Sequence, residues 1–306
     1  MTPTSADIDL AAQRLKGRIR QIPLAAMEPT GRDIDLLLKL ENHQHAGSFK
    51  PRGALNAALA ACERGPLPAG LITFSSGNHG QAVALAAAEI GVPAVVVAPT
   101  DVRPTKLAAM EARGARVILH GLTSRERMER AMEMAASDGL LLIPPYDHPD
   151  VIAGQGTIGR EIAFEAPAPF VVVVPIGGGG LSAGICLALS RRDDVRVIGV
   201  EPEDADDARR SLAAGRIVSN ERASTSACDG LRNTRIGDLN FAILHDHLSE
   251  IVSVSEADVA EAQRALERAG HGPVEPSGAA AVAAVLAGQA GRPGETVVCV
   301  VSGGNA

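Results

Sequence analysis

The sequence predicts an α/β protein with two parallel-sheet domains, each doubly wound in three layers, and a ligand site in the cleft between them. Short apolar, β-rich runs alternate with Ala-rich helical stretches almost from end to end. The strand segments are continuously apolar, as in residues 171–176, which is typical of parallel strands buried on both faces. The segments are too many for one comfortable sheet, so we expect two domains.

The elements follow from local composition. Strands are expected where β-branched and other apolar residues run together, at residues 36–40, 70–74, 94–98, 116–120, 140–143, 170–175, 195–201 and 296–301. Helices are expected where strong helix formers dominate, at residues 53–62, 78–90, 105–113, 124–137, 152–165, 181–189, 256–269 and 278–286. Residues 216–247 show no regular pattern and are predicted to be rich in loops. We assign residues 68–147 to a small domain inserted between residues 1–67 and 148–306 of a large one.

The composition excludes several classes of function. The 306-residue chain is 46% hydrophobic and 21% charged, with a net charge of −7, which argues against a nucleic-acid partner. The N-terminus has no basic start followed by an apolar run, and the apolar segments are too short to span a membrane. The four cysteines lie far apart without metal-ligand spacing, which favours free thiols in a reducing compartment. A cytoplasmic protein is expected.

Lysine is rare in this chain. Of 29 basic residues, only Lys16, Lys39, Lys50 and Lys106 are lysines. An amine that must lose its proton cannot be replaced by a guanidinium, so a retained lysine is a candidate reactive group. Lys50 lies in the segment GSFKPRGA, where a Ser and a Pro predict the start of a helix. The positive helix end and apolar neighbours would lower its pKa and make the amine nucleophilic.

Three further segments lie where predicted strands end. Residues 75–80, SSGNHG, expose backbone N–H groups at a helix start, which suits a substrate carboxylate. Residues 177–180 are four consecutive glycines between a strand and a helix, a pattern that suits phosphate binding by backbone amides. Residues 302–305, SGGN, follow the last strand. Ligands bind beyond the carboxyl ends of parallel strands, so these segments are expected to converge.

A dinucleotide-binding protein is the rival interpretation. Gly178, Gly180 and Ala183, followed by Glu201 at the end of the next strand, resemble a dinucleotide fingerprint. This interpretation leaves Lys50 and the SSGNHG segment without a role.

Six segments in order, GSFKPRGA, SSGNHGQA, VIAGQGTIGREI, GGGGLSAG, EPEDADDA and SGGN, resemble the serine/threonine dehydratase and serine racemase family of pyridoxal-phosphate (PLP) enzymes. The resemblance extends from about Ile22 to Asn305 and implies a tryptophan-synthase-β-like fold. The chain departs from the family pattern at Ala46, where a Thr is usual. It also departs from it in Ile22-Pro23-Leu24, where Thr-Pro-Leu is frequent. Both changes affect the expected polar lining of the substrate pocket.

The resemblance implies roles for individual residues. Lys50 would carry PLP as a Schiff base and remove the α-proton, and Ser76 would lie on the opposite face of the cofactor ring. The remaining cofactor ligands would be Phe49, Asn78, Gly177, Gly178, Gly179, Gly180 and Ser302. The substrate carboxylate would be bound by Ser75, Ser76, Gly77 and His79.

The implied activity is an ammonia-lyase (dehydratase) that converts a β-hydroxy amino acid such as threonine or serine to a 2-oxo acid and ammonia. Serine racemase and 3-hydroxyaspartate dehydratase activities of the same family are the alternatives. A homodimer is expected. Glu201, Ala205 and Asp207 match positions that hold a divalent cation in this family, which implies Mg²⁺ or Ca²⁺. An acidic helix cap is the alternative interpretation of that segment.

Overall fold

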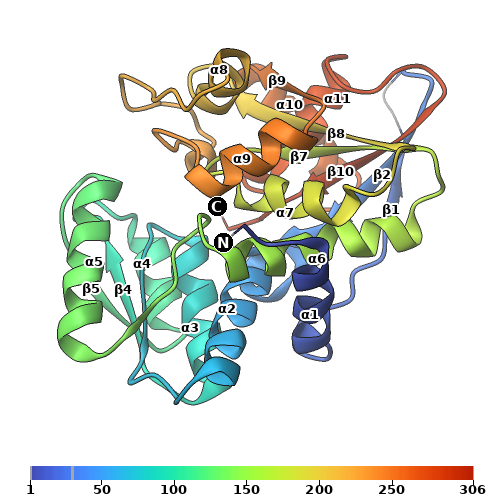
Figure 1. The fold of residues 1–306 in the computed structure, drawn as a ribbon. Helices are drawn as coiled ribbons and strands as arrows, with labels where there is room; N and C mark the ends of the chain where they lie inside the picture. Colours follow the sequence, from blue (N-terminus) through green and yellow to red (C-terminus); the bar gives the residue numbers. More distant parts are fainter. Residues whose placement is uncertain (1, 29–30, 306) are drawn as a thin grey trace.

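The computed structural model describes residues 2–28 and 31–305 as two lobes, each built on a β-sheet (Figure 1). The larger sheet has the strand order β1-β2-β10-β7-β8-β9 and the smaller one β5-β4-β3-β6. The larger sheet comprises β1 (Ala25–Met27), β2 (Ile34–Leu40), β10 (Glu295–Val301), β7 (Phe170–Pro175), β8 (Val195–Pro202) and β9 (Glu250–Val254). The smaller comprises β5 (Ala115–Leu119), β4 (Ala94–Ala98), β3 (Leu71–Phe74) and β6 (Leu141–Leu142).

Helices cover both faces of the larger sheet. Val171 and Val173 of β7 pack in the core shared with α10 (Glu256–Arg268) and α11 (Pro276–Leu286). Val172 and Val174 point to the other face, which is covered by α1 (Ser5–Leu15), α6 (Pro149–Glu165), α7 (Gly180–Leu189) and α9 (Asp238–His247). Successive residues of a strand point to opposite faces, so two buried faces require the continuous apolar run of β7.

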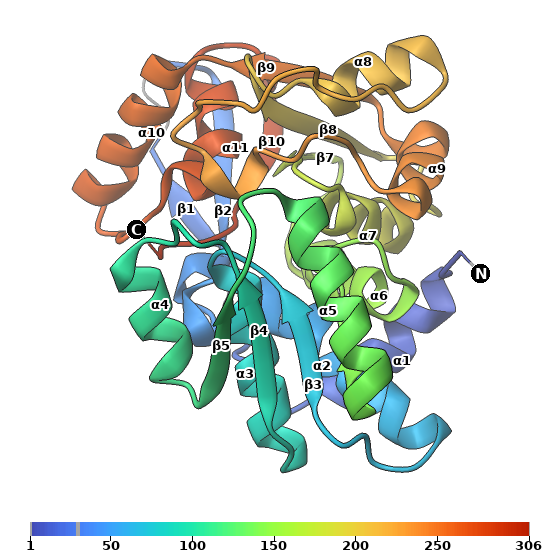
Figure 2. The same ribbon diagram turned by 90° about the vertical axis from the view of Figure 1, so that its left-hand side faces the viewer.

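The smaller sheet has the same three-layer arrangement, seen in the lower half of Figure 2. Ile72, Val95 and Val97 pack against α5 (Ser124–Asp138) on one face. The opposite face packs against α2 (Lys50–Arg64) and α3 (Asn78–Ile90). Helix α2 also contacts α6 of the larger lobe and therefore lies between the two lobes (Figures 1 and 2).

The predicted α/β fold with two parallel-sheet regions is confirmed, and every predicted strand and helix has a counterpart. One pairing differs, because β1 runs antiparallel to β2 at the edge of the larger sheet. The domain boundaries at residues 68 and 147 stay a prediction. No helix in residues 2–28 and 31–305 is long and apolar enough to cross a membrane.

The structure also contains elements that the sequence pattern did not predict. These are α1, β1, β9, α8 (Asp207–Ala214) and α9. Residues 216–247 were predicted to be rich in loops, which holds up to residue 237 apart from the short 3₁₀ helix Asp229–Leu231, but the end of the stretch forms α9. Polar residues dilute the apolar pattern of α9, and only Asn240, Ile243 and Leu244 of this helix are buried.

Candidate active site

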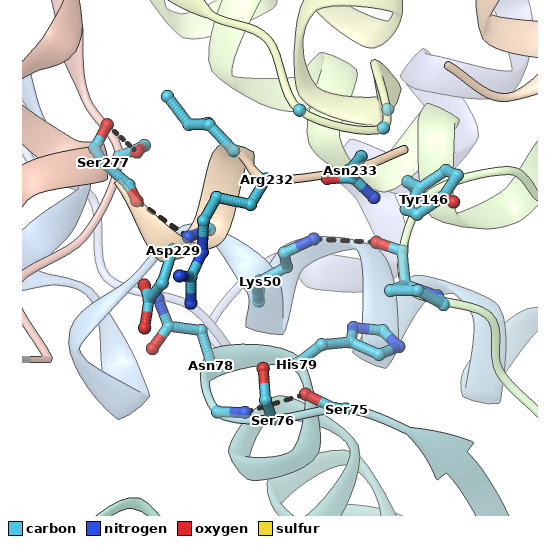
Figure 3. A pocket seen from close by; sticks show the side chains of 18 of the residues that line it. Lys50, Ser75, Ser76, Asn78, His79, Tyr146, Asp229, Arg232, Asn233 and Ser277 are labelled. Atoms are coloured by element: carbon cyan, nitrogen blue, oxygen red, sulfur yellow. Dashed lines mark hydrogen bonds between the residues drawn. The ribbon is translucent and has the colours of Figure 1, made fainter. Parts of the chain in front are cut away.

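One pocket lies between the lobes, and both lobes contribute to its lining (Figure 3). The parallel strands β3, β7 and β10 direct their carboxyl ends toward it, as in other open α/β sheets. The predicted cofactor and substrate residues all line this pocket: Phe49, Lys50, Ser75, Ser76, Gly77, Asn78, His79, Gly177, Gly178, Gly179, Gly180 and Ser302. Segments far apart in the chain therefore meet here.

Lys50 is the first residue of α2, with Pro51 in the first turn. Its Nζ donates a hydrogen bond of 2.8 Å to the Pro145 carbonyl and lies 4.9 Å from the centre of the Phe49 ring. Burial lowers the pKa of Lys50 to about 8, although the Glu275 carboxylate opposes this shift. The amine is therefore far more easily deprotonated than an ordinary lysine and can act as a nucleophile or base near neutral pH.

A buried ion-pair network fixes the first turn of α2 behind Lys50. The Arg52 guanidinium donates two hydrogen bonds of 2.8 Å to the Glu41 carboxylate and two, of 2.6 and 2.9 Å, to the Glu161 carboxylate. Both Arg52 and Glu41 are fully buried. Burial alone would lower the pKa of Arg52, but the two carboxylates raise it above its ordinary value. Bidentate pairing of this kind restricts the orientation of the helix start that carries Lys50.

The Ser75–His79 loop joins β3 to α3. The Ser75 hydroxyl accepts a hydrogen bond of 3.1 Å from the Gly77 N–H. Burial and the nearby Lys50 lower the pKa of His79 to about 3, so its ring is neutral. Since Nε2 donates to the Ile143 carbonyl at 3.0 Å, Nδ1 carries a lone pair. That lone pair cannot bind a carboxylate, which leaves this task to the loop amides and the Ser75 and Ser76 hydroxyls.

The glycine loop between β7 and α7 has no room for side chains. A Cβ on Gly178 would lie 2.3 Å from Cγ of Tyr146. Gly179 has φ +91°, a conformation that L-residues with side chains rarely adopt. The loop lies at the N-terminus of α7, where free N–H groups and the helix dipole favour an anion. These features fit the phosphate group of PLP.

Glu275, which was not predicted from the sequence, precedes α11 and lines the pocket. Its carboxylate accepts a hydrogen bond of 2.7 Å from the Asn78 side chain. Burial and the neighbouring Asp229 raise the pKa of Glu275 to about 7, so it exchanges a proton near neutral pH. The Asn78 side chain also accepts a hydrogen bond of 3.0 Å from the Asn305 side chain. This bond links the SSGNHG segment to the SGGN segment at the end of the chain. The Glu-Pro pair at a helix start is the local sequence feature that could have marked Glu275.

An ion pair crosses the pocket from one lobe to the other. Lys106 of α4 (Pro104–Glu111) pairs with Asp229, the first residue of a short 3₁₀ helix, Asp229–Leu231. The aliphatic part of Lys106 also lies against Gly77, since a Cβ there would be 3.3 Å from its Cδ. Lys106 and Asp229 therefore cover one side of the loop that follows β3.

The predicted metal ligands lie outside this pocket, at the end of β8 and the start of α8. The Glu201 carboxylate accepts backbone hydrogen bonds from Ala208 at 3.0 Å and Arg209 at 2.8 Å, so it caps α8. Asp207 Oδ1 accepts from Asn220, while its buried Oδ2 has no hydrogen-bond partner among the described residues. Within residues 2–28 and 31–305, no group of three His, Cys, Asp or Glu side chains could hold a metal ion. A site that includes the Ala205 carbonyl stays a prediction.

Residues 15–303 match the family model described as pyridoxal-phosphate dependent enzyme. An L-threo-3-hydroxyaspartate ammonia-lyase of Saccharomyces cerevisiae is 36% identical, with 100% of this chain and 94% of the yeast protein covered. A serine racemase of Schizosaccharomyces pombe is 36% identical over 99% of this chain and 94% of its own length. The crystal structure of a threonine deaminase from T.th. superposes with a TM-score of 0.92 at 41% identity, covering 99% of each chain.

Proposed function

Since the chain belongs to the family of pyridoxal-phosphate dependent enzymes, we propose that it is an ammonia-lyase acting on a β-hydroxy amino acid. One observation carries this proposal. The buried amine of Lys50, with its pKa lowered to about 8, shares a pocket with the glycine loop and the Ser75–Gly77 loop. These are a nucleophile, a phosphate cradle and a carboxylate-binding turn. The dinucleotide interpretation is wrong, because the family match covers almost the whole chain and Glu201 caps a helix.

The residues present fit PLP. Gly177–Gly180 would bind its phosphate, Phe49 would pack beside its ring, and Asn78 and Ser302 would contact polar atoms at the ring edge. Bound PLP would supply the carbonyl carbon that condenses with an amine and a ring that withdraws electrons from the substrate. Ser302 is only 4% exposed, and its hydroxyl contacts the Ser277 carbonyl at 3.4 Å. A neutral hydroxyl at this position does not enforce a positive charge on the ring nitrogen as a carboxylate would.

Residues of the chain itself would bind the substrate and transfer its protons. Loop amides and the Ser75 and Ser76 hydroxyls would hold the substrate carboxylate and so orient the α-carbon. Once released by the incoming substrate amine, the Lys50 amine would take the α-proton. The β-hydroxyl then leaves as water, and hydrolysis gives the 2-oxo acid and ammonia. Racemisation shares the α-proton step and is the second candidate activity, favoured by Ser76 in the same pocket.

The test is an assay of 2-oxo acid and ammonia with the PLP-loaded enzyme and L-threonine or L-serine, alongside chiral analysis of the remaining amino acid. Borohydride reduction followed by peptide mapping should place the pyridoxyl group on Lys50. Lys50→Ala should abolish both label and turnover, whereas Lys16→Ala, an exposed lysine at the end of α1, should change neither. A label on Lys39 or Lys106, or no product from any hydroxy amino acid, would refute the proposal.

A further inference from the structure

The pocket is lined by more positively charged side chains than negatively charged ones. The cations are Lys50, Lys106, Arg127 and Arg232, and the anions are Asp229 and Glu275. Lys106 is neutralised by Asp229, and Lys50 would be joined to the cofactor. Glu275 already accepts a hydrogen bond from Asn78. Among the residues that the structure describes, neither of the two guanidinium groups pairs with a carboxylate.

The two arginines differ in their surroundings. Arg127 of α5 donates hydrogen bonds of 3.0 Å to the Leu122 carbonyl and of 3.0 Å to the Ser124 hydroxyl. Arg232 follows the 3₁₀ helix Asp229–Leu231, and its side chain points into the pocket (Figure 3). Within residues 2–28 and 31–305, no hydrogen bond or ion pair engages the Arg232 guanidinium. The buried Nε of Arg127 also lacks a partner among the described residues, but both terminal nitrogens of Arg127 are engaged. Arg232 is the pocket arginine whose guanidinium donors are all free.

A bound substrate would lie within reach of these donors. Its amine must reach the position of Lys50, and its carboxylate the Ser75–Gly77 loop, on the side of the pocket opposite the loop that carries Arg232 (Figure 3). The side chain of the substrate then fills the space that Arg232 faces. An apolar side chain would displace water from the guanidinium without replacing its hydrogen bonds, which is unfavourable. A carboxylate would replace them with a bidentate pair.

We propose that Arg232 binds a second carboxylate, carried on Cβ of the substrate, so that the preferred substrate is a β-hydroxy-α-amino dicarboxylate such as 3-hydroxyaspartate. This inference rests on the proposed ammonia-lyase function. The Cβ–O bond breaks, and the hydroxyl leaves with the α-proton as one molecule of water. One water is consumed when the C–N bond is hydrolysed, so the net products are a 2-oxo dicarboxylate and ammonia. No oxidant or reductant is needed.

Binding can be measured separately from elimination. L-Aspartate and L-asparagine have nearly the same shape, lack a β-hydroxyl, and differ in the charge of the side chain. Titration of the PLP-loaded enzyme, followed by its visible absorbance, should give a dissociation constant roughly 10- to 100-fold lower for L-aspartate, the range for a charge-assisted pair. Arg232→Gln should abolish this preference, and Arg232→Lys should retain part of it.

The matched control is Arg235→Gln, because Arg235 lies in the same segment, pairs with Asp238 and does not line the pocket. It should leave the L-aspartate preference intact. In turnover, Arg232→Gln should lower kcat/KM for threo-3-hydroxyaspartate by roughly 10- to 100-fold more than it lowers that for L-threonine, whereas Arg235→Gln should leave the ratio of the two values unchanged.

Equal affinity for L-aspartate and L-asparagine in the unmodified enzyme would overturn the role of Arg232. A preference that survives Arg232→Gln would overturn it as well. In both cases L-threonine turnover would still support an ammonia-lyase. Failure of every hydroxy amino acid to yield a 2-oxo acid would instead overturn the proposed function itself.

Discussion

Lys50 and Ser76 enter the pocket from different segments, the start of α2 and the loop after β3 (Figure 3). Bound PLP would be planar and present two faces, and the single amine of Lys50 could serve only the face on which it lies. We expect Lys50 to take the α-proton of an L-amino acid. Elimination from that substrate then needs no proton transfer by Ser76.

Ser76→Ala should therefore abolish racemisation and turnover of D-isomers while leaving much of the L-dehydratase rate. Loss of a positioned acid or base costs about 10²–10⁴-fold, which makes the selective loss easy to detect. Initial rates with L- and D-serine, together with chiral analysis of the amino acid, provide the measurement. Equal losses for both isomers, with PLP still bound, would contradict the two-face division.

The low pKa of Lys50 gives a second prediction at the residue scale. Only the neutral amine can attack the PLP carbonyl. Burial lowers the pKa of Lys50 to about 8, so roughly a tenth of the amine is neutral at pH 7 and most of it at pH 9. The rate at which the apoenzyme captures PLP should rise across this interval and then level off. A rate that keeps rising toward pH 10.5 would indicate an ordinary lysine; Lys50→Ala serves as the control for non-covalent binding.

The sequence was most informative for residues in contiguous motifs. Lys50 and Gly177–Gly180 could be predicted because their chemistry depends on neighbours within a few positions. Glu275 was missed because its partner Asn78 is 197 residues away and becomes a neighbour only in the folded chain. His79 was predicted at the pocket, but its neutral state depends on burial and on the nearby Lys50, and neither can be read from the local sequence.

At the scale of elements, a similar distinction separates predicted from missed structure. Strand β7 and helix α3 were predicted with correct bounds because their apolar patterns agree with local propensity. Strand β1 is a short edge strand that depends on pairing with β2, and α9 is stabilised by tertiary contacts. The first turn of α9 donates hydrogen bonds to Asp147, a residue 91 positions earlier. Such long-range contacts leave no periodic pattern in the sequence.

Helix α2 offers a prediction for element stability. Arg52→Met should lower the free energy of unfolding by about 3–5 kcal/mol, because it leaves the buried Glu41 carboxylate without its partner. Urea denaturation would measure the change. Arg125→Ala is the control: Arg125 forms an exposed i,i+4 pair with Glu129 and should change stability by less than about 0.5 kcal/mol. Similar small effects in both variants would show that the network does not anchor α2.

At the scale of the whole molecule, the pocket depends on the way the two lobes meet. Helix α2 contacts both lobes, and Lys106 pairs with Asp229 across the pocket. The sequence predicted two sheets but not this arrangement, because no local pattern specifies how separate lobes pack. The pocket could be inferred only from the general tendency of ligands to bind at the carboxyl ends of parallel strands.

A divalent cation at Glu201, Ala205 and Asp207 would act on the stability of the native molecule. The buried Oδ2 of Asp207 lacks a hydrogen-bond partner among the described residues, as expected of a ligand atom. Mg²⁺ or Ca²⁺ at about 100 times its dissociation constant should raise the free energy of unfolding by about 2.7 kcal/mol, because the unfolded chain does not bind it. Thermal denaturation with and without chelator would measure this difference.

Asp207→Asn keeps the shape of the side chain and removes its charge, so it should abolish the cation effect. Glu203→Gln changes an exposed carboxylate in the same segment and should preserve the effect. If chelator leaves the melting temperature of the unmodified protein unchanged, and Asp207→Asn melts at the same temperature with or without the cation, Glu201 serves only to cap α8. The two backbone hydrogen bonds that Glu201 already accepts would then be its whole contribution.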